Sequence, residues 1–163
     1  MKTKFTVLVL CCAFGSGLKA QSLSYQNRFR QLKTVNIVVE DLPPDAEKLG
    51  LTTGDLESVA IVALKSKAPK ITVSDKAAMS YVYINVTLVC GEYICATNAD
   101  VSLERPTTIL KDDDKTEVGF SMANVWHKNT LFMGPREMMA HRVKEYIDEA
   151  LTSFAAEWYK ANP

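Results

Sequence analysis

The sequence predicts an α+β domain with a mainly antiparallel sheet of about five strands and helices that cover one face of it. Two alternating segments joined by a short loop indicate a long β-hairpin. A capped segment and a long C-terminal segment show apolar residues at helical spacing. The elements follow the order strand, helix, strand, strand, strand, strand, helix, which is typical of this fold class.

The first twenty residues have the pattern of a secretory signal peptide. Lys2 and Lys4 supply a basic start, Phe5–Phe14 is an apolar run, and Ala20 is a small residue suited to cleavage. The run is too short to cross a bilayer as a helix, so we expect no integral membrane segment. The predicted location is therefore periplasmic or secreted.

Removal of residues 1–20 would leave 143 of the 163 residues, enough for one domain with a core. The leader holds three of the 19 cationic residues and none of the 19 acidic ones, so the remaining net charge is about −3. This charge disfavours nucleic acid as a partner, because binding to phosphates needs Lys and Arg. We expect a partly ordered polar arm over residues 21–33 and a single α+β domain over residues 34–163.

The first strand is predicted over Thr34–Glu40, where β-branched residues alternate, and Pro43 and Pro44 end it. Thr52 and Asp55 form the pattern of a capping box that opens a helix. The helix ends before Pro69, and residues 70–74 form a short second strand.

The hairpin is the best-determined element. Its strands are Tyr81–Cys90 and Cys95–Leu103, joined by the loop Gly91–Ile94. A slip of one residue would turn a whole apolar set into water, so the alternation specifies the register. The expected pairs include Val82–Leu103, Ile84–Val101, Val86–Ala99, Leu88–Thr97 and Cys90–Cys95 on one face. Pro106 is expected to end the second strand.

A charged turn is predicted over residues 107–115, followed by a last strand over Glu117–Trp126. Val118, Phe120, Met122 and Trp126 are expected on one side of this strand, with Trp126 in the core. Pro135 suits the first turn of a helix that continues to Lys160. His127 and Arg136 then lie in the connecting loop.

Two of the four cysteines, Cys90 and Cys95, lie outside the leader. The exported setting and their opposed positions predict a disulfide. Two buried thiols or a redox-active pair are the alternatives, but the C-x-x-C spacing of redox sites is absent. Within the leader, Leu10 before Cys11 is unfavourable for lipidation.

The sequence predicts no metal, no cofactor and no catalytic set. His127 and His141 have no further His or Cys at ligand spacing. Asp112–Asp114 lacks the alternating ligands and glycine of an EF-hand, so we interpret it as a solvated turn.

The outward face of the hairpin is the candidate binding surface, through Tyr81, Tyr83, Asn85 and Asp100. Tyrosines beside amides and carboxylates suit a protein or cell-envelope partner, although tyrosine is also simply a good strand residue. The predicted function is a non-enzymatic exported domain that binds through this open face. A small periplasmic hydrolase or transferase, with His127 beside a carboxylate, is the alternative. Homodimerisation through an exposed strand edge is a third hypothesis.

Several segments together resemble a family of exported bacterial proteins with no established activity. The resemblance spans most of the chain after the leader, implies a Gram-negative periplasmic setting, and carries no catalytic residue. The Cys90 and Cys95 hairpin departs from the family pattern. The segments that carry the resemblance are Val35–Leu42, Leu49–Thr52, Tyr81–Val86, Asn124–Trp126 and Trp158–Pro163.

Overall fold

The computed structural model describes residues 28–74, 78–110 and 117–163. The predicted leader (1–20), most of the predicted arm and Asp112–Asp114 lie outside the described residues. The elements are β1 (Thr34–Val39), α2 (Pro44–Lys48), α3 (Thr53–Lys67), β2 (Thr72–Val73), β3 (Tyr81–Cys90), β4 (Ile94–Leu110), β5 (Glu117–Pro135), the 3-10 turn η1 (Arg136–Met138) and α4 (Met139–Ala161).

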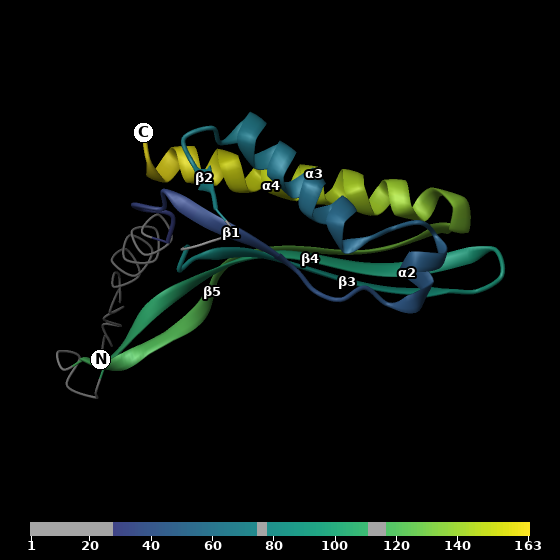
Figure 1. Cartoon of the computed structure of the whole chain (residues 1–163), viewed down its shortest axis with the longest axis horizontal. Helices are drawn as coiled ribbons and strands as arrows, with labels where there is room; N and C mark the ends of the chain where they lie inside the picture. Colours follow the sequence, from purple (N-terminus) through teal and green to yellow (C-terminus); the bar gives the residue numbers. More distant parts are fainter. Residues whose placement is uncertain (1–27, 75–77, 111–116) are drawn as a thin grey trace, which may run out of the picture.

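One sheet of five strands runs in the order β2-β1-β3-β4-β5, and α3 and α4 lie side by side over one of its faces (Figure 1). The predicted α+β class and the helices on one face are confirmed. The two longest ladders, β3–β4 and β4–β5, are antiparallel as predicted. The sheet is nevertheless mixed and not antiparallel only, because β1 is parallel to both β2 and β3. A helix between β1 and β2 returns the chain to the same end of the sheet, which makes the two strands parallel.

The predicted hairpin register is confirmed throughout. Val82 pairs with Leu103, Val86 with Ala99, and Cys90 with Cys95, as the alternation indicated. The inward residues of β3 and β4 are buried against α3 and α4, whereas no helix of the described residues lies on the opposite face of the two strands (Figure 1). Burial of one face only is the condition that makes a register this specific.

The prediction that Pro106 ends the second strand is wrong. β4 continues to Leu110, and Pro106 pairs with Met122 of β5. The last pair between β3 and β4 is Tyr81–Glu104, so beyond it the β3 side of β4 is an edge. Edge positions tolerate proline because no neighbouring strand needs its missing N–H. Residues 107–110 of the predicted charged turn therefore belong to a two-stranded ribbon that projects from the sheet (Figure 1).

The predicted end of the last strand at Trp126 is also wrong, since β5 runs to Pro135 and includes His127. Leu103 pairs with Trp126 and Glu104 with Asn124, which leaves Val125 as the extra residue of a β-bulge. The bulge changes the face on which alternate residues lie. Trp126 is buried, as predicted, but Val118, Phe120 and Met122 are exposed and not on its side.

The expected helix start at Pro135 is displaced. Pro135 precedes η1, and α4 begins at Met139. Arg136 therefore lies in η1 rather than in a loop. The apolar stripe predicted for α4 is confirmed, with Val143, Ile147, Leu151 and Phe154 fully buried.

The start of α3 follows the predicted capping box. The Thr52 hydroxyl accepts a hydrogen bond from the Asp55 backbone N–H at 3.1 Å, and Asp55 Oδ2 accepts one from the Thr52 N–H at 3.1 Å. Two N–H groups that the first turn leaves unpaired are thus satisfied. The short helix α2 was not predicted.

Candidate functional site

The four predicted binding residues lie together on the sheet face opposite to α3 and α4. Tyr81 pairs with Glu104 and Asn85 with Asp100, so β3 and β4 bring them onto adjacent positions. Tyr81, Tyr83, Asn85 and Asp100 are all half-buried. We call this set, with Glu40 and Glu104, the tyrosine patch.

Within the patch, the Tyr81 and Tyr83 rings meet edge to face, with centroids 6.4 Å apart and planes at 62°. Glu40, immediately after β1, accepts a hydrogen bond from the Asn85 side-chain amide. Hydrogen bonding to the Glu40 carboxylate, with some burial, raises the pKa of Tyr83. Sequence reasoning missed Glu40, because the parallel pairing of β1 with β3 was not predicted.

His127 of β5 lies close to Asp100, a member of this patch. Burial raises the pKa of the Asp100 carboxyl, and the charge of His127 offsets part of that rise. His127 is an exposed residue of β5, opposite Ser102, and not a loop residue as predicted. The pair therefore lies on the sheet face opposite to α3 and α4, with His127 exposed and Asp100 half-buried.

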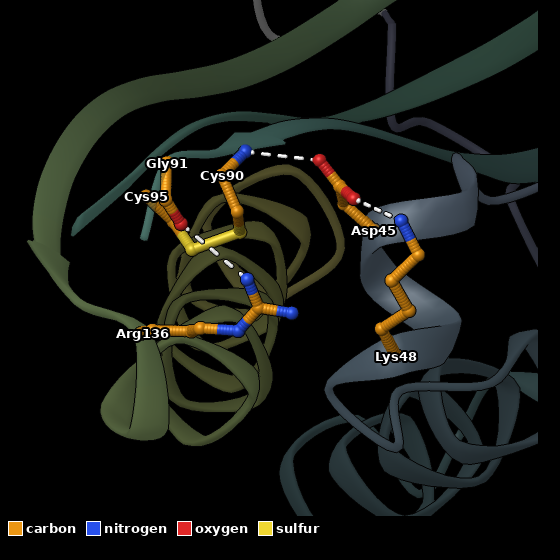
Figure 2. Close-up of a disulfide and its surroundings, with 6 residues drawn as sticks. All are labelled: Asp45, Lys48, Cys90, Gly91, Cys95 and Arg136. Atoms are coloured by element: carbon orange, nitrogen blue, oxygen red, sulfur yellow. Dashed lines mark hydrogen bonds and ion pairs between the residues drawn. A yellow bond between two sulfur atoms is a disulfide. The ribbon is translucent and has the colours of Figure 1, made fainter. Parts of the chain in front are cut away.

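The other end of the hairpin holds the predicted disulfide, Cys90–Cys95, which is confirmed (Figure 2). The Gly91 N–H donates to the Ile94 carbonyl at 2.8 Å, so the cysteines form a non-hydrogen-bonded pair, with Cα atoms 4.0 Å apart. Such pairs bring opposed side chains closest together. The Cys90 N–H points away from β4 and donates to Asp45 Oδ2 at 3.0 Å.

Two short elements, α2 and η1, form hydrogen bonds to this end of the hairpin (Figure 2). Asp45 of α2 also accepts a hydrogen bond from Lys48 Nζ at 2.9 Å. Hydrogen bonding from Lys48 and from the Cys90 N–H keeps the pKa of Asp45 below its ordinary value. On the other side, the Arg136 guanidinium donates to the Gly91 carbonyl at 3.4 Å.

Beside the disulfide lies a hollow of about 730 Å³, lined by Leu49, Tyr93, Ile94, Met133 and Arg136 among others. Met133, which lines this hollow, also lies on the open sheet face, where Val89, Leu131 and Met133 are 66%, 75% and 65% exposed. A second hollow, of about 620 Å³, lies between α3 and α4 and is lined by Val62 and Lys144 among others. Neither hollow is lined by His127 or Asp100.

The second histidine, His141, lies on α4 and belongs neither to the tyrosine patch nor to the disulfide end of the hairpin. His141 Nε2 lies 3.0 Å from Glu145 Oε1 on the exposed side of α4. Among the described residues, no group of three His, Cys, Asp or Glu side chains could hold a metal ion. In the same residues, no helix is long and apolar enough to span a bilayer.

No family model matches this sequence, and no curated protein is similar to it. Among solved structures, the crystal structure of a minor lipoprotein from Acinetobacter baumannii is similar over 78% of this chain and 88% of that one. The two are 11% identical, with a TM-score of 0.29. A likeness at this level carries no argument about the function of this chain.

Proposed function

We propose that this chain is a non-enzymatic exported domain that binds a protein or a cell-envelope component through the open face of its sheet. The observation that carries the proposal is that no helix within residues 28–74, 78–110 and 117–163 covers this face. Both long helices lie on the opposite side of the sheet (Figure 1). Tyr81 and Tyr83 alternate with the buried Val82 and Ile84, and both tyrosines are half-buried and not fully covered. Tyrosine supplies large contact area and a hydrogen-bonding hydroxyl at low conformational cost.

Export is supported by two features of different kinds. The first twenty residues have the pattern of a signal peptide. Cys90 and Cys95 form a disulfide, which is stable in oxidising compartments such as the periplasm or the extracellular space.

The chemistry of the open face favours a partner that is not strongly anionic. Glu40, Asp100 and Glu104 supply carboxylates around the tyrosines. Lys128, the one lysine or arginine of β5, lies on the helical side of the sheet, where it donates to Ser153. A polar, neutral or cationic surface complements this patch, whereas a phosphate-rich one is repelled. The apolar side chains toward the disulfide end extend the same face.

The hydrolase or transferase alternative rests on the pair Asp100 and His127. A raised carboxyl pKa beside a histidine is a feature of some active sites. Catalytic pairs act inside clefts that exclude water, however, and these two residues lie on an exposed sheet. The binding function therefore has the stronger support.

The test is affinity capture from envelope extract with the exported full chain, comparing three proteins. The double variant Tyr81→Thr, Tyr83→Thr keeps strand propensity and removes both rings. The matched control is Tyr159→Ala, which removes an exposed tyrosine from α4, on the other side of the sheet.

We expect one partner to be captured by the wild type and the control and to bind the double variant at least about thirtyfold more weakly, as for interface hot spots. Equal capture by all three proteins would contradict the proposal. A double variant with a markedly lower melting temperature would show instead that the two rings serve stability.

A further inference from the structure

β5 is the outermost strand of the sheet, with β4 on one side only. Its central residues His127, Lys128, Asn129 and Leu131 are exposed. An edge strand presents backbone N–H and C=O groups that a further strand can pair with. Whether a further strand can pair with this edge depends on which residues of β5 direct their backbone N–H and C=O groups away from β4, in the plane of the sheet.

Two hydrogen bonds identify the outward-facing residues. The Arg136 N–H donates to the Tyr93 carbonyl at 3.0 Å, which makes the adjacent pair Ile94–Pro135 non-hydrogen-bonded. Antiparallel pairs alternate, so Met133, Leu131, Asn129 and His127 also direct both backbone groups away from β4. In agreement, Arg142 Nη1 donates to the Met133 carbonyl from outside the ladder at 2.9 Å.

Arginines close this edge at both ends. Arg142 donates a hydrogen bond to the Met133 carbonyl, and Arg28 Nη1 donates one to the carbonyl of the bulged Val125 at 2.9 Å. The bulge and the two guanidiniums are devices that discourage pairing where they lie. Between them, no hydrogen bond within the described residues reaches the outward groups of His127, Asn129 and Leu131. Asn129 is the middle residue of this window.

We propose that a second copy of the chain pairs with this window, β5 against β5, antiparallel about a two-fold axis at Asn129. Asn129 would then face Asn129 of the second copy, His127 would face Leu131, and Lys128 would face Thr130. The three outward residues of each copy would exchange about six backbone hydrogen bonds, two for each facing pair. The proposal stands apart from the binding function above.

The side chains of the window suit this pairing. Lys128, the one lysine or arginine of the window, faces a threonine and not its own copy. The apolar Leu131, 75% exposed in one chain, lies against an imidazole. Two asparagine amides meet on the axis, where each can donate and accept. Like charges directly opposite, which destabilise strand pairs, are absent from the register.

The helices leave room for the second copy. α4 packs mainly against β4 rather than β5. The two β4 strands of the dimer would be three strand spacings apart, about 14 Å, whereas packed helices need 8–10 Å between axes. A two-fold axis normal to the sheet keeps both helical layers on one side. Both open faces then form one continuous surface with two tyrosine patches.

The experiment uses the exported full chain and measures its mass by light scattering over a range of concentrations. The test variant is Asn129→Lys, which places like charges face to face on the axis. In a single chain the same substitution is favourable, because Asn129 pairs with Asp100 on β4. The matched control is Asn98→Lys, an exposed asparagine on the same face but one strand inward.

We expect a dimer of the wild type and the control, and a dissociation constant raised roughly fivefold or more for Asn129→Lys. Hydrogen exchange of the wild type gives an independent readout that needs no variant. The amides of His127, Asn129 and Leu131 should gain protection as concentration rises, while those of Lys128 and Thr130, which face β4, should not change.

Three results would each overturn the proposal. A wild type that stays monomeric with unchanged exchange at those three amides excludes it. A dimer equally sensitive to Asn98→Lys would be a face-to-face stack. A dimer insensitive to Asn129→Lys would use another surface.

Discussion

The carboxylate of Asp45 accepts a hydrogen bond from the backbone N–H of Cys90 at 3.0 Å, forty-five residues along the chain. That N–H lies on the β3 edge beyond the last pair with β1, Val39–Ile84. A short helix thus supplies, through one side chain, the acceptor that a neighbouring strand would otherwise provide. The disulfide end of the hairpin is closed by this contact on one side and by Arg136 on the other.

Replacement of Asp45 should expose the Cys90 N–H on the edge of β3 to solvent. We expect the Cys90 amide to exchange with solvent about tenfold faster in Asp45→Ala, because its hydrogen bond is lost. Asp45→Asn keeps a neutral acceptor oxygen, so its Cys90 amide should exchange at a rate between those of Asp45→Ala and the wild type. Hydrogen exchange followed by NMR measures this directly, and unchanged exchange at Cys90 in Asp45→Ala would contradict it.

The same contact should weaken in acid. The pKa of Asp45 is lowered in the folded chain, by hydrogen bonding from Lys48 first and from the Cys90 N–H second. A lowered pKa stabilises the folded state fully above the ordinary carboxyl value of 3.8. Protection of the Cys90 amide should therefore persist at pH 5 and decline as the pH falls below about 4. A decline already complete at pH 5 would contradict this assignment.

The disulfide should make a modest contribution to stability. It closes a loop with a sequence separation of 5, for which the chain-entropy model gives about 2 kcal/mol. Reductant should lower the free energy of unfolding of the wild type by this amount in a urea titration. The double variant Cys90→Ala, Cys95→Ala should show the lower value with or without reductant. Two free thiols in the oxidised protein would contradict the bond itself.

The hairpin could be predicted from sequence because both of its strands have one buried and one open face. Strict alternation on two segments, joined by a short loop, left one register, and it is the one observed. The disulfide and the shared face of Tyr81, Tyr83, Asn85 and Asp100 follow from that register alone. Their role in binding remains a proposal.

Beyond the hairpin, the sequence carried less information. Pro106 normally ends a strand, and only the absence of β3 beside it explains why β4 continues. On the N-terminal side of the Val125 bulge, the alternation that starts from the buried Trp126 no longer indicates which residues face the core. The prediction for Phe120 and Met122 was therefore wrong. Glu40 and Asp45 join the site through β1 pairing and through α2, which are tertiary features without a local pattern.

The segment before β1 contributes to the core more than its polar composition indicates. Phe29 is 1% exposed and meets the Phe154 and Trp126 rings edge to face, at centroid distances of 5.4 and 6.4 Å. Leu32 is buried, and its carbonyl accepts a hydrogen bond from Trp158 Nε1 at 2.9 Å. This part of the predicted arm is therefore tied to α4.

Phe29→Ala should consequently lower the free energy of unfolding by roughly 3–5 kcal/mol, the usual cost of removing a buried aromatic ring. Phe120→Ala is the matched control, because Phe120 is 73% exposed on the projecting ribbon. We expect the control to change stability by less than about 0.5 kcal/mol. Urea titration followed by tryptophan fluorescence measures both, and similar losses in the two variants would contradict the packing described here.

Tyr146 should make stability depend on alkaline pH. Its hydroxyl is buried without a hydrogen-bond partner among the described residues. Burial, with the negative charges of Asp100 and Glu149 adding to it, raises the pKa of Tyr146 to about 12 from an ordinary value of 10.0. The unfolded chain then loses this proton at a lower pH than the folded chain does. The resulting stability is complete below pH 10 and is lost as the pH rises from about 10 to about 12.

Tyr146→Phe removes this titration and fills the same space, so the comparison isolates it. Near pH 8 we expect the variant to match the wild type or exceed it slightly, since no hydrogen bond within the described residues is lost. At pH 11 the variant should be more stable than the wild type by a further amount of about 1.4 kcal/mol. Denaturant titrations at both pH values measure the difference, in which the lysines common to both proteins cancel. Parallel pH profiles would mean that the Tyr146 phenol ionises as readily in the folded chain as in the unfolded one, and so that water reaches it.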